Sequence, residues 1–132
     1  MSAATVGIVL VSHSAELAAG AAHLAGQVSG GTVTVIAAGG TDDGDLGTSA
    51  AKVARGLSLA DSGAGVVVLP DLGSAVLTVR AVLEDEDPAT NVVMADAPFV
   101  EGAVAATVTA AAGGDIKAVA AAAEEARNAR KL

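Results

Sequence analysis

The sequence predicts an α/β fold: a doubly wound, mostly parallel sheet of four to five strands with helices on both faces. Three observations predict it. Strand-like and helix-like segments alternate along the 132 residues. The strand-like segments are continuous apolar runs, as expected for parallel strands that are covered on both faces. The chain also has no linker, charge block or internal repeat, so we expect residues 1–132 to form a single domain with right-handed crossovers.

The first half of the chain predicts two strands and two helices. Residues 6–11 are an aliphatic run and predict the first strand, and apolar residues spaced for one face predict a helix over 14–28. The β-branched residues of 32–38 predict the second strand. A polar, glycine-rich loop follows, and then a helix over 48–60, for which Thr48 is a suitable N-cap.

The second half repeats the alternation. Residues 66–70 predict a third buried strand, followed by a helix that we expect Pro88 to stop. Residues 91–95 predict the fourth strand. Pro98 is well placed as the first residue of the next helix, and the alanine-rich residues 115–131 predict a final amphipathic helix.

The composition narrows the class of protein. Hydrophobic residues make up 52% of the chain but aromatic residues only 1%, so the core must consist of aliphatic residues and alanine, which let helices lie close to a sheet. The absence of cysteine excludes disulfides and thiolate metal sites. A net charge of -8 argues against nucleic acid as a partner. The amino terminus lacks the basic leader of a signal peptide, and no apolar run is long enough for a membrane span, so we expect a cytoplasmic protein without membrane contact.

Polar residues follow the predicted strands at their carboxyl ends, where doubly wound folds place their sites. His13 follows the first strand and Asp71 the third. If the strand order is 2-1-3-4, these two residues lie on neighbouring strands within hydrogen-bonding distance. Asp71 could then accept the Nδ1 proton of His13, fix the tautomer, and leave Nε2 facing solvent as a nucleophile.

Groups that could hold a phosphate lie beside this pair. Ser14 and the first amides of the helix that follows it could bind phosphate oxygens, because a helix amino terminus attracts anions. Gly73 and Ser74 open another helix and offer the same donors. The chain has no P-loop lysine motif, and amides with hydroxyls suit a site that takes and releases one phosphoryl group.

The same residues also have structural interpretations. His13 could be a histidine at a helix start whose ring is satisfied by the backbone. Asp71 could be the N-cap of the next helix, a role that is compatible with contacting His13. Ser14 and Ser74 are also ordinary residues for the first turn of a helix. From the residues alone, both interpretations stay open.

Acidic residues elsewhere in the chain also have structural interpretations. Asp42, Asp43 and Asp45 lie close together, but the pattern of a calcium-binding loop and its late glutamate are missing, so a solvated turn is the better interpretation. Glu101 could simply cap the helix that begins near Pro98.

Four segments together carry a resemblance to a known family. They are "VSHS", "GGTDDGDLGTSA", "DLGSA" and "APFVEGAVAATVTAAAGGDI", in this order at the predicted strand ends. The chain resembles, from residue 6 to about residue 116, the phosphotransferase subunits of PTS-dependent dihydroxyacetone kinase, whose phosphocarrier domain has the mannose-type EIIA fold.

The resemblance implies a specific function. His13 would take a phosphoryl group from phospho-HPr on Nε2 and pass it to ADP held in a partner subunit, with Asp71 oriented toward the histidine and no cofactor bound by this chain. The resemblance implies a homodimer. It also implies that phospho-HPr is a separate protein, because the chain ends at Leu132 without HPr-like domains. The residues that would line the rim of the site or contact partners are Gly40, Thr41, Asp42 and Glu101.

The sequence leaves two alternative functions open. A sugar-transport EIIA component of the same fold would donate to an EIIB domain, although "DLGSA" and "GGTDDG" favour the kinase subunit. A non-catalytic regulatory module of flavodoxin-like type would not depend on His13. A dinucleotide-binding enzyme is disfavoured because no GxGxxG motif follows the first strand.

Overall fold

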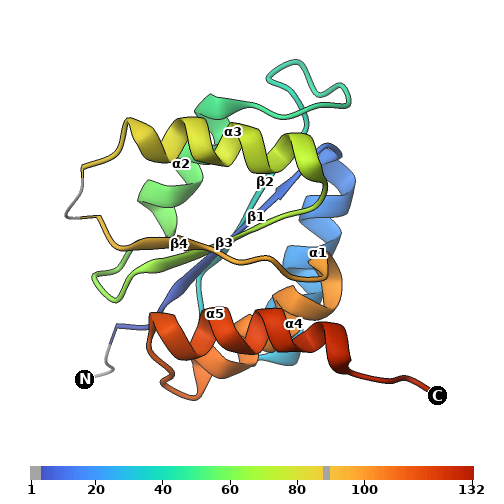
Figure 1. Cartoon of the computed structure of the whole chain (residues 1–132), viewed down its shortest axis with the longest axis vertical. Coiled ribbons are helices and arrows are strands. Elements are labelled where there is room, and N and C mark those ends of the chain that lie inside the picture. Colours follow the sequence, from blue (N-terminus) through green and yellow to red (C-terminus); the bar gives the residue numbers. More distant parts are fainter. Residues whose placement is uncertain (1–3, 88–89) are drawn as a thin grey trace.

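A computed structural model describes residues 4–87 and 90–132. Among them, four parallel strands form one sheet in the order β2-β1-β3-β4 (Figure 1). The sequence therefore predicted the doubly wound class correctly, and the strand order is the one on which the expected contact of His13 with Asp71 was conditional. The sheet has four strands, all of them parallel, in the described part of the chain. The strands are β1 (Gly7–Ser12), β2 (Val35–Gly39), β3 (Val66–Pro70) and β4 (Val92–Met94).

Helices cover both faces of the sheet. Figure 1 shows α2 and α3 on one face and α1, α4 and α5 on the other. None of the helices in the described ranges is long and apolar enough to cross a membrane. The helices are α1 (Ala15–Val28), α2 (Ala50–Ala60), α3 (Gly73–Glu84), α4 (Phe99–Ala111) and α5 (Ile116–Glu125), followed by a short 3-10 helix, η1 (Ala126–Asn128).

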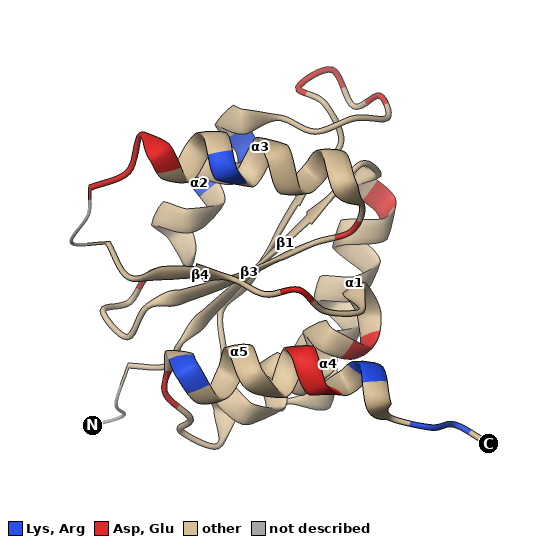
Figure 2. Cartoon of the chain, viewed as in Figure 1, with Lys and Arg blue, Asp and Glu red and all other residues tan. Residues whose placement is uncertain are grey.

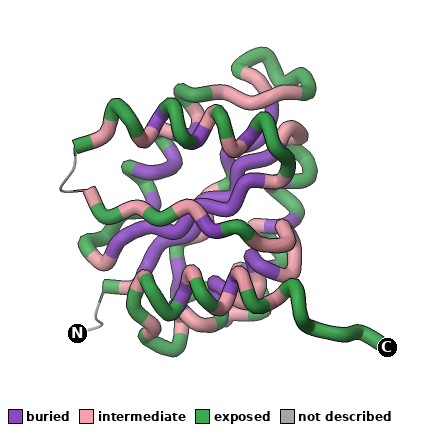
Figure 3. Tube along the Cα trace, in the orientation of Figure 1, coloured by how far each residue is buried: buried purple, intermediate pink, exposed green. Residues whose placement is uncertain are grey.

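The apolar residues of the strands contribute to two hydrophobic cores, one on each face of the sheet. In β1, Ile8 and Leu10 pack on the side of α1, α4 and α5, whereas Val9 and Val11 pack on the side of α2 and α3. All four side chains are fully buried, and Figure 3 shows the buried residues running through the sheet between the two helical layers. Small residues of α4 allow that helix to lie close to the sheet, namely Ala103, Ala106 and Ala110.

The start of α2 differs from the prediction by one residue. The N-cap is Ser49, whose hydroxyl accepts a hydrogen bond from the backbone N–H of Lys52 at 3.1 Å. Thr48, the expected cap, has its hydroxyl 2.7 Å from that of Thr78 in α3. The side chain of Thr48 therefore joins two helices instead of capping one.

The ends of other helices also differ from the prediction. Pro98 is the N-cap of α4 and not its first residue. The last helix ends at Glu125, well before residue 131, because no residue beyond Ala123 is buried and a short helix depends on such packing. Pro88, which we expected to stop α3, lies outside the described residues, and α3 already ends at Glu84.

Two strand boundaries are set by pairing. β2 begins at Val35 and not at residue 32, because its ladder with β1 begins with the pair of Ile8 and Val35. β4 is shorter than predicted because only Val92–Met94 pair with β3.

Two glycines bring the end of β2 against the start of α1. A Cβ atom at Gly39 would lie 2.5 Å from the backbone oxygen of Ser14, so only glycine fits there. Gly40 has a φ of 75°, in the left-handed region that favours glycine. Its N–H donates to the oxygen of Ser12 at 3.1 Å. This close approach places the loop after β2 beside the carboxyl end of β1.

Candidate functional site

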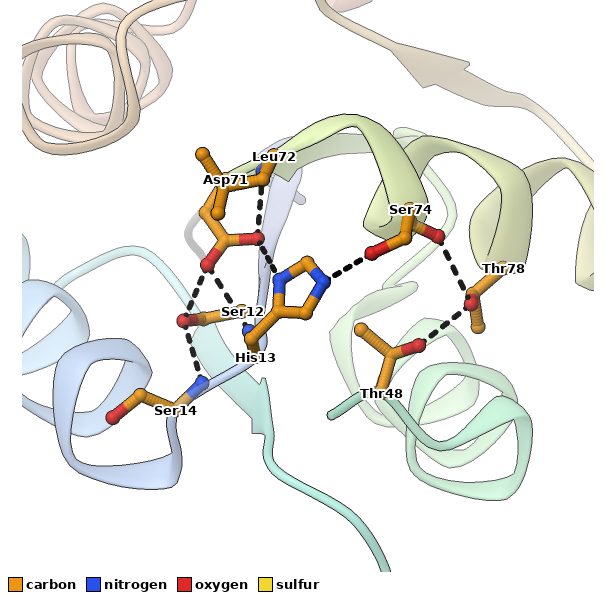
Figure 4. Close-up of polar contacts among 8 residues, drawn as sticks. All are labelled: Ser12, His13, Ser14, Thr48, Asp71, Leu72, Ser74 and Thr78. Atoms are coloured by element: carbon orange, nitrogen blue, oxygen red, sulfur yellow. Dashed lines mark hydrogen bonds and ion pairs between the residues drawn. The ribbon is translucent and has the colours of Figure 1, made fainter. Parts of the chain in front are cut away.

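The site is built where β1 and β3 end side by side. His13 directly follows β1 and Asp71 directly follows β3, and these two strands pair in parallel. The Nδ1 atom of His13 lies 2.8 Å from Oδ1 of Asp71 (Figure 4). This is the contact that the strand order 2-1-3-4 predicts.

The carboxylate of Asp71 is held by donors at both oxygens. Oδ1 accepts from the backbone N–H of Leu72 at 2.7 Å and also faces the His13 ring. Oδ2 accepts from the Ser12 hydroxyl at 2.8 Å and from the backbone N–H of His13 at 3.0 Å. With the side chain only 8% exposed, these bonds fix both the position and the plane of the carboxylate.

These donors also set the charge of Asp71. Burial by itself raises the pKa of this carboxyl, but the hydrogen bonds from the His13 backbone, the Ser12 hydroxyl, the His13 ring and the Leu72 backbone outweigh it and lower the pKa below the ordinary value of 3.8. At neutral pH the carboxylate is therefore ionised and can only accept hydrogen bonds. Nδ1 of His13 must then carry the ring proton, which leaves a lone pair on Nε2.

The Nε2 atom, which we expected to face solvent, has a protein partner at an exposed position of the site. It contacts the hydroxyl of Ser74, although the His13 side chain keeps an exposed fraction of 25% (Figure 4). The reason is local: α3 begins two residues after Asp71, and its first turn brings Ser74 back toward the imidazole. The Ser74 hydroxyl donates to the Nε2 lone pair in this tautomer.

Backbone amides lie near the same atom. Gly73 and Ser74 are the first two residues of α3, whose N-cap is Leu72 and not Asp71. Within the described part of the chain, no side chain caps this helix. The N–H of Ala75 donates to the oxygen of Leu72 at 3.0 Å, and the N–H groups of Gly73 and Ser74 remain as hydrogen-bond donors. Together with the helix dipole they favour an anion at this end of α3.

Ser14 lies differently from what the sequence suggested. Its hydroxyl is the N-cap of α1 and accepts from the backbone N–H of Leu17 at 3.1 Å. Figure 4 shows this side chain pointing away from the His13 imidazole. The structure therefore does not bring the Ser14 hydroxyl together with the Nε2 atom.

Three of the expected rim residues lie in the loop after β2. Thr41 closes this loop by hydrogen bonds with Asp45, and Asp42 accepts from the Ser49 hydroxyl. The loop reaches the site through Gly47, whose N–H donates to the backbone oxygen of His13 at 2.9 Å. The loop that holds Gly40, Thr41 and Asp42 thus packs against His13 through its backbone.

Glu101, the fourth expected rim residue, has a different partner. Its Oε2 atom lies 2.9 Å from Nζ of Lys131 near the end of the chain, and both side chains are exposed. The Lys131 ammonium lowers the pKa of Glu101 below its ordinary range. Among the described residues, no interaction joins Glu101 to His13 or Asp71.

Acidic residues are concentrated in the loop after β2 and at the end of α3, whereas basic residues are scattered along the chain (Figure 2). In residues 4–87 and 90–132, no three histidine, aspartate or glutamate side chains lie together as a metal site requires. A cleft of about 440 Å³ opens beside Asp71, between α3 and the end of β4. Among the described residues, its lining includes the basic Arg80 as well as the acidic Asp71 and Asp96. The candidate site therefore adjoins a concave surface that carries a basic side chain.

Ser12 is the residue of this site to which the sequence gave us no role. It ends β1, is fully buried, and contacts Asp71 directly. The available signal was a serine at the end of an aliphatic strand, immediately before the histidine, since a buried hydroxyl needs a partner.

The fold and the site define a class of protein. The chain belongs to the EIIA-man family, described as the fructose IIA component of the phosphotransferase system, and its match to this family extends over residues 7–120.

Individual relatives are more specific. The chain is 37% identical over 105 residues to the phosphoryl donor subunit DhaM of PEP-dependent dihydroxyacetone kinase 2 from Listeria innocua, covering 78% of this chain and 84% of that one. It is 32% identical to the DhaM subunit from Lactococcus lactis, of which it covers 90%. The DhaM subunit from Pantoea ananatis is 42% identical over 119 residues, but the chain spans only 25% of that longer protein.

A solved structure agrees with these sequence matches. The crystal structure of EF1359, a protein of unknown function, superimposes with a TM-score of 0.82 at 33% identity and covers 97% of both chains. The fold is therefore shared over nearly the whole length.

Proposed function

We propose that this chain is a phosphohistidine carrier that accepts a phosphoryl group from phospho-HPr and donates it to ADP bound in a partner subunit of dihydroxyacetone kinase. The names of its relatives, which are phosphoryl donor subunits of that kinase, support the proposal. The single observation that carries it is the 2.8 Å contact between His13 Nδ1 and Asp71 Oδ1, which leaves Nε2 as the nucleophilic ring atom.

In the first step, the Nε2 lone pair of His13 attacks the phosphorus of phospho-HPr. A new P–N bond forms at Nε2 while the P–N bond in phospho-HPr breaks, and its electron pair stays with the HPr imidazole. The proton on Nδ1 does not move, because the ionised Asp71 holds it. The ring gains positive character as the bond forms, and the adjacent carboxylate stabilises that charge.

Ser74 must change partner during this step. Its hydroxyl contacts the Nε2 lone pair in the free protein, so it has to rotate away before phosphorus can approach. After transfer the same hydroxyl can donate to a phosphoryl oxygen, as can the amides of Gly73 and Ser74 at the start of α3. These donors are neutral, so the phosphoryl group is held without a basic side chain and can leave again.

In the second step, a terminal phosphate oxygen of ADP attacks the phosphorus, the P–N bond breaks, and its electron pair returns to Nε2. The nucleotide belongs to the partner subunit in this proposal, and the chain itself binds no cofactor. A net charge of -8 would repel free nucleotides and leave delivery to the docked partner.

The proposal includes two further properties. The protein would act in the cytoplasm, where it meets phospho-HPr, and it would form a homodimer. The position of β4 is compatible with a dimer, since it is an edge strand whose outer side pairs with no strand among the described residues. Sedimentation equilibrium would measure the mass in solution, and a monomer at all concentrations would contradict the dimer.

The test of the function is a phosphorylation assay. The chain is incubated with phosphoenolpyruvate, enzyme I and HPr, and the adduct is read by intact mass. The wild type is compared with His13→Ala and with His23→Ala, a matched control because His23 is an exposed histidine in the middle of α1. We expect an acid-labile phosphoryl adduct on the wild type and His23→Ala only, and its discharge when the ADP-loaded partner subunit is added.

Each other outcome has a distinct meaning. An adduct that only an EIIB domain discharges would make the chain a sugar-transport component. No adduct on the wild type, or an equal adduct on His13→Ala, would contradict the phosphohistidine carrier and favour a regulatory module.

A further inference from the structure

We propose that Ser12 is a positioning residue for phosphoryl transfer, whose buried hydroxyl holds Asp71 in the orientation that keeps the proton of His13 on Nδ1. The proposal rests on the proposed function of His13 but concerns a residue that does not touch the phosphoryl group. It follows from the two hydrogen bonds of the Ser12 hydroxyl, one with the Ser14 backbone and one with the Asp71 carboxylate.

The hydroxyl of Ser12 lies between a backbone amide and a carboxylate. Its oxygen accepts from the backbone N–H of Ser14 at 3.0 Å, and its oxygen lies 2.8 Å from Oδ2 of Asp71. An amide N–H can only donate, and an ionised carboxylate can only accept. The one hydroxyl proton of Ser12 is therefore directed to Asp71.

The hydrogen bond from Ser12 gives the two carboxylate oxygens of Asp71 different partners. Oδ2 is held by the Ser12 hydroxyl and the His13 backbone N–H, which leaves Oδ1 turned toward the imidazole. Without the hydroxyl, Oδ2 would keep only one donor, and the carboxylate could rotate about its bond to Cβ. The 2.8 Å contact with Nδ1 would then be one of several arrangements.

The backbone of Ser12 is itself fixed. It ends β1, pairs with Gly39 of β2, and its carbonyl oxygen accepts from the Gly40 N–H at 3.1 Å. Its side chain is fully buried and has no room to adopt a solvated alternative. The hydroxyl is thus a rigid donor on a rigid element, as the positioning of a reacting group requires.

The described part of the chain offers a matched control. Thr107 is the other fully buried polar side chain, and its hydroxyl donates to the Ala103 oxygen within α4 at 2.7 Å. Removing the Thr107 hydroxyl loses one hydrogen bond, and removing the Ser12 hydroxyl loses two, of which one is the bond to Asp71. Ser12→Ala and Thr107→Val therefore separate a general loss of stability from a specific effect on the site.

The test has two readouts in the free protein and one in the assay. The ¹⁵N shifts of the His13 ring report its tautomer, a ¹³C titration of the Asp71 carboxyl reports its pKa, and the assay with phospho-HPr reports the rate of phosphoryl acceptance. For Ser12→Ala we expect a mixture of tautomers, a higher pKa for Asp71, and a rate about tenfold lower, since a hydrogen bond to a charged group is lost. Thr107→Val should keep the wild-type tautomer and a rate within about twofold of wild type.

The proposal would be overturned if Ser12→Ala kept the wild-type tautomer and the wild-type rate, provided that the wild-type protein itself accepts the phosphoryl group in the same assay. If Ser12→Ala does not fold, Ser12→Cys replaces it, because a thiol is a weaker hydrogen-bond donor than a hydroxyl. It should shift the tautomer and the Asp71 pKa in the same direction, and wild-type behaviour would again overturn the proposal. Failure of the proposed function looks different: the wild type forms no adduct, while the tautomer still responds to Ser12.

Discussion

Asp71 Oδ1 lies 2.8 Å from His13 Nδ1 although 58 residues separate the two in the sequence. Two features of the fold produce this contact. β1 and β3 are neighbours in the sheet, and both strands end at the same edge, so the residues that follow them meet. The chain between the two residues contains α1, β2 and α2, so the contact joins two strands that are separated by two crossovers.

The first prediction concerns the charge of Asp71. Asp71→Asn replaces an acceptor by a side chain whose amide can donate, so the Nδ1 proton of His13 loses its fixed acceptor. We expect the rate of phosphoryl acceptance to fall by at least about 100-fold, as in other sites where this change disturbs the tautomer of a reacting histidine. The rate is measured by intact mass after rapid mixing with phospho-HPr.

The control for this variant is Asp43→Asn, which removes one charge from the exposed loop after β2. It should leave the rate within about twofold of wild type. Equal rates for wild type and Asp71→Asn would show that the carboxylate has no role in orienting the ring.

The second prediction concerns stability and pH. Because the pKa of Asp71 in the folded protein lies below its ordinary value of 3.8, the ionised carboxylate stabilises the fold above that value. This stabilisation is lost as the pH falls through the folded pKa. The free energy of unfolding, measured with urea, should therefore favour wild type over Asp71→Asn at neutral pH, and the difference should shrink below pH 3.8. A difference that is independent of pH would contradict the lowered pKa.

Much of this fold could be predicted from the sequence because the signals are local and repeated. The aliphatic run of β1 and the helical spacing of α1 each specify one element, and their alternation specifies the sheet. The contact of His13 with Asp71 was expected on the condition that the strand order is 2-1-3-4, which is the order of the sheet. Element ends were less predictable, as Thr48 shows: Ser49 has the same capping chemistry, and the contact of Thr48 with Thr78 is long-range.

The roles of single hydroxyls could not be read from the sequence. Ser12, Ser14 and Ser74 all lie close to strand ends, but one holds Asp71, one caps α1, and one contacts Nε2. Which partner each hydroxyl finds depends on the direction of its side chain. A one-residue step reverses that direction along a strand and turns it by about 100° along a helix.

The third prediction concerns the Ser74 hydroxyl. Ser74→Ala removes a donor that can hold the phosphoryl group once it is attached to Nε2. At equilibrium with phospho-HPr, we expect the phosphorylated fraction, as a ratio to free protein, to fall about tenfold, since a hydrogen bond to a charged oxygen contributes about 1.5–3 kcal/mol. Intact mass gives this ratio. Ser58→Ala is the control, because Ser58 is an exposed serine within α2, and equal ratios for both variants would leave Ser74 without a role in holding phosphate.

The last prediction separates two roles for Ser14, helix cap and phosphate ligand. Its hydroxyl caps α1 through the Leu17 N–H, so Ser14→Ala should lower the free energy of unfolding by about 1 kcal/mol. Asp115→Ala is the matched control, because Asp115 caps α5 in the same way through the Ala118 N–H and has no contact with His13 among the described residues.

Both variants should accept the phosphoryl group at a rate within about twofold of wild type, since neither cap is directed at Nε2. Urea unfolding and the mass assay measure the two effects on the same samples. If Ser14→Ala slowed acceptance by more than about tenfold while Asp115→Ala did not, the Ser14 hydroxyl would have to turn toward the phosphoryl group during transfer. The cap seen in the free protein would then open at each turnover.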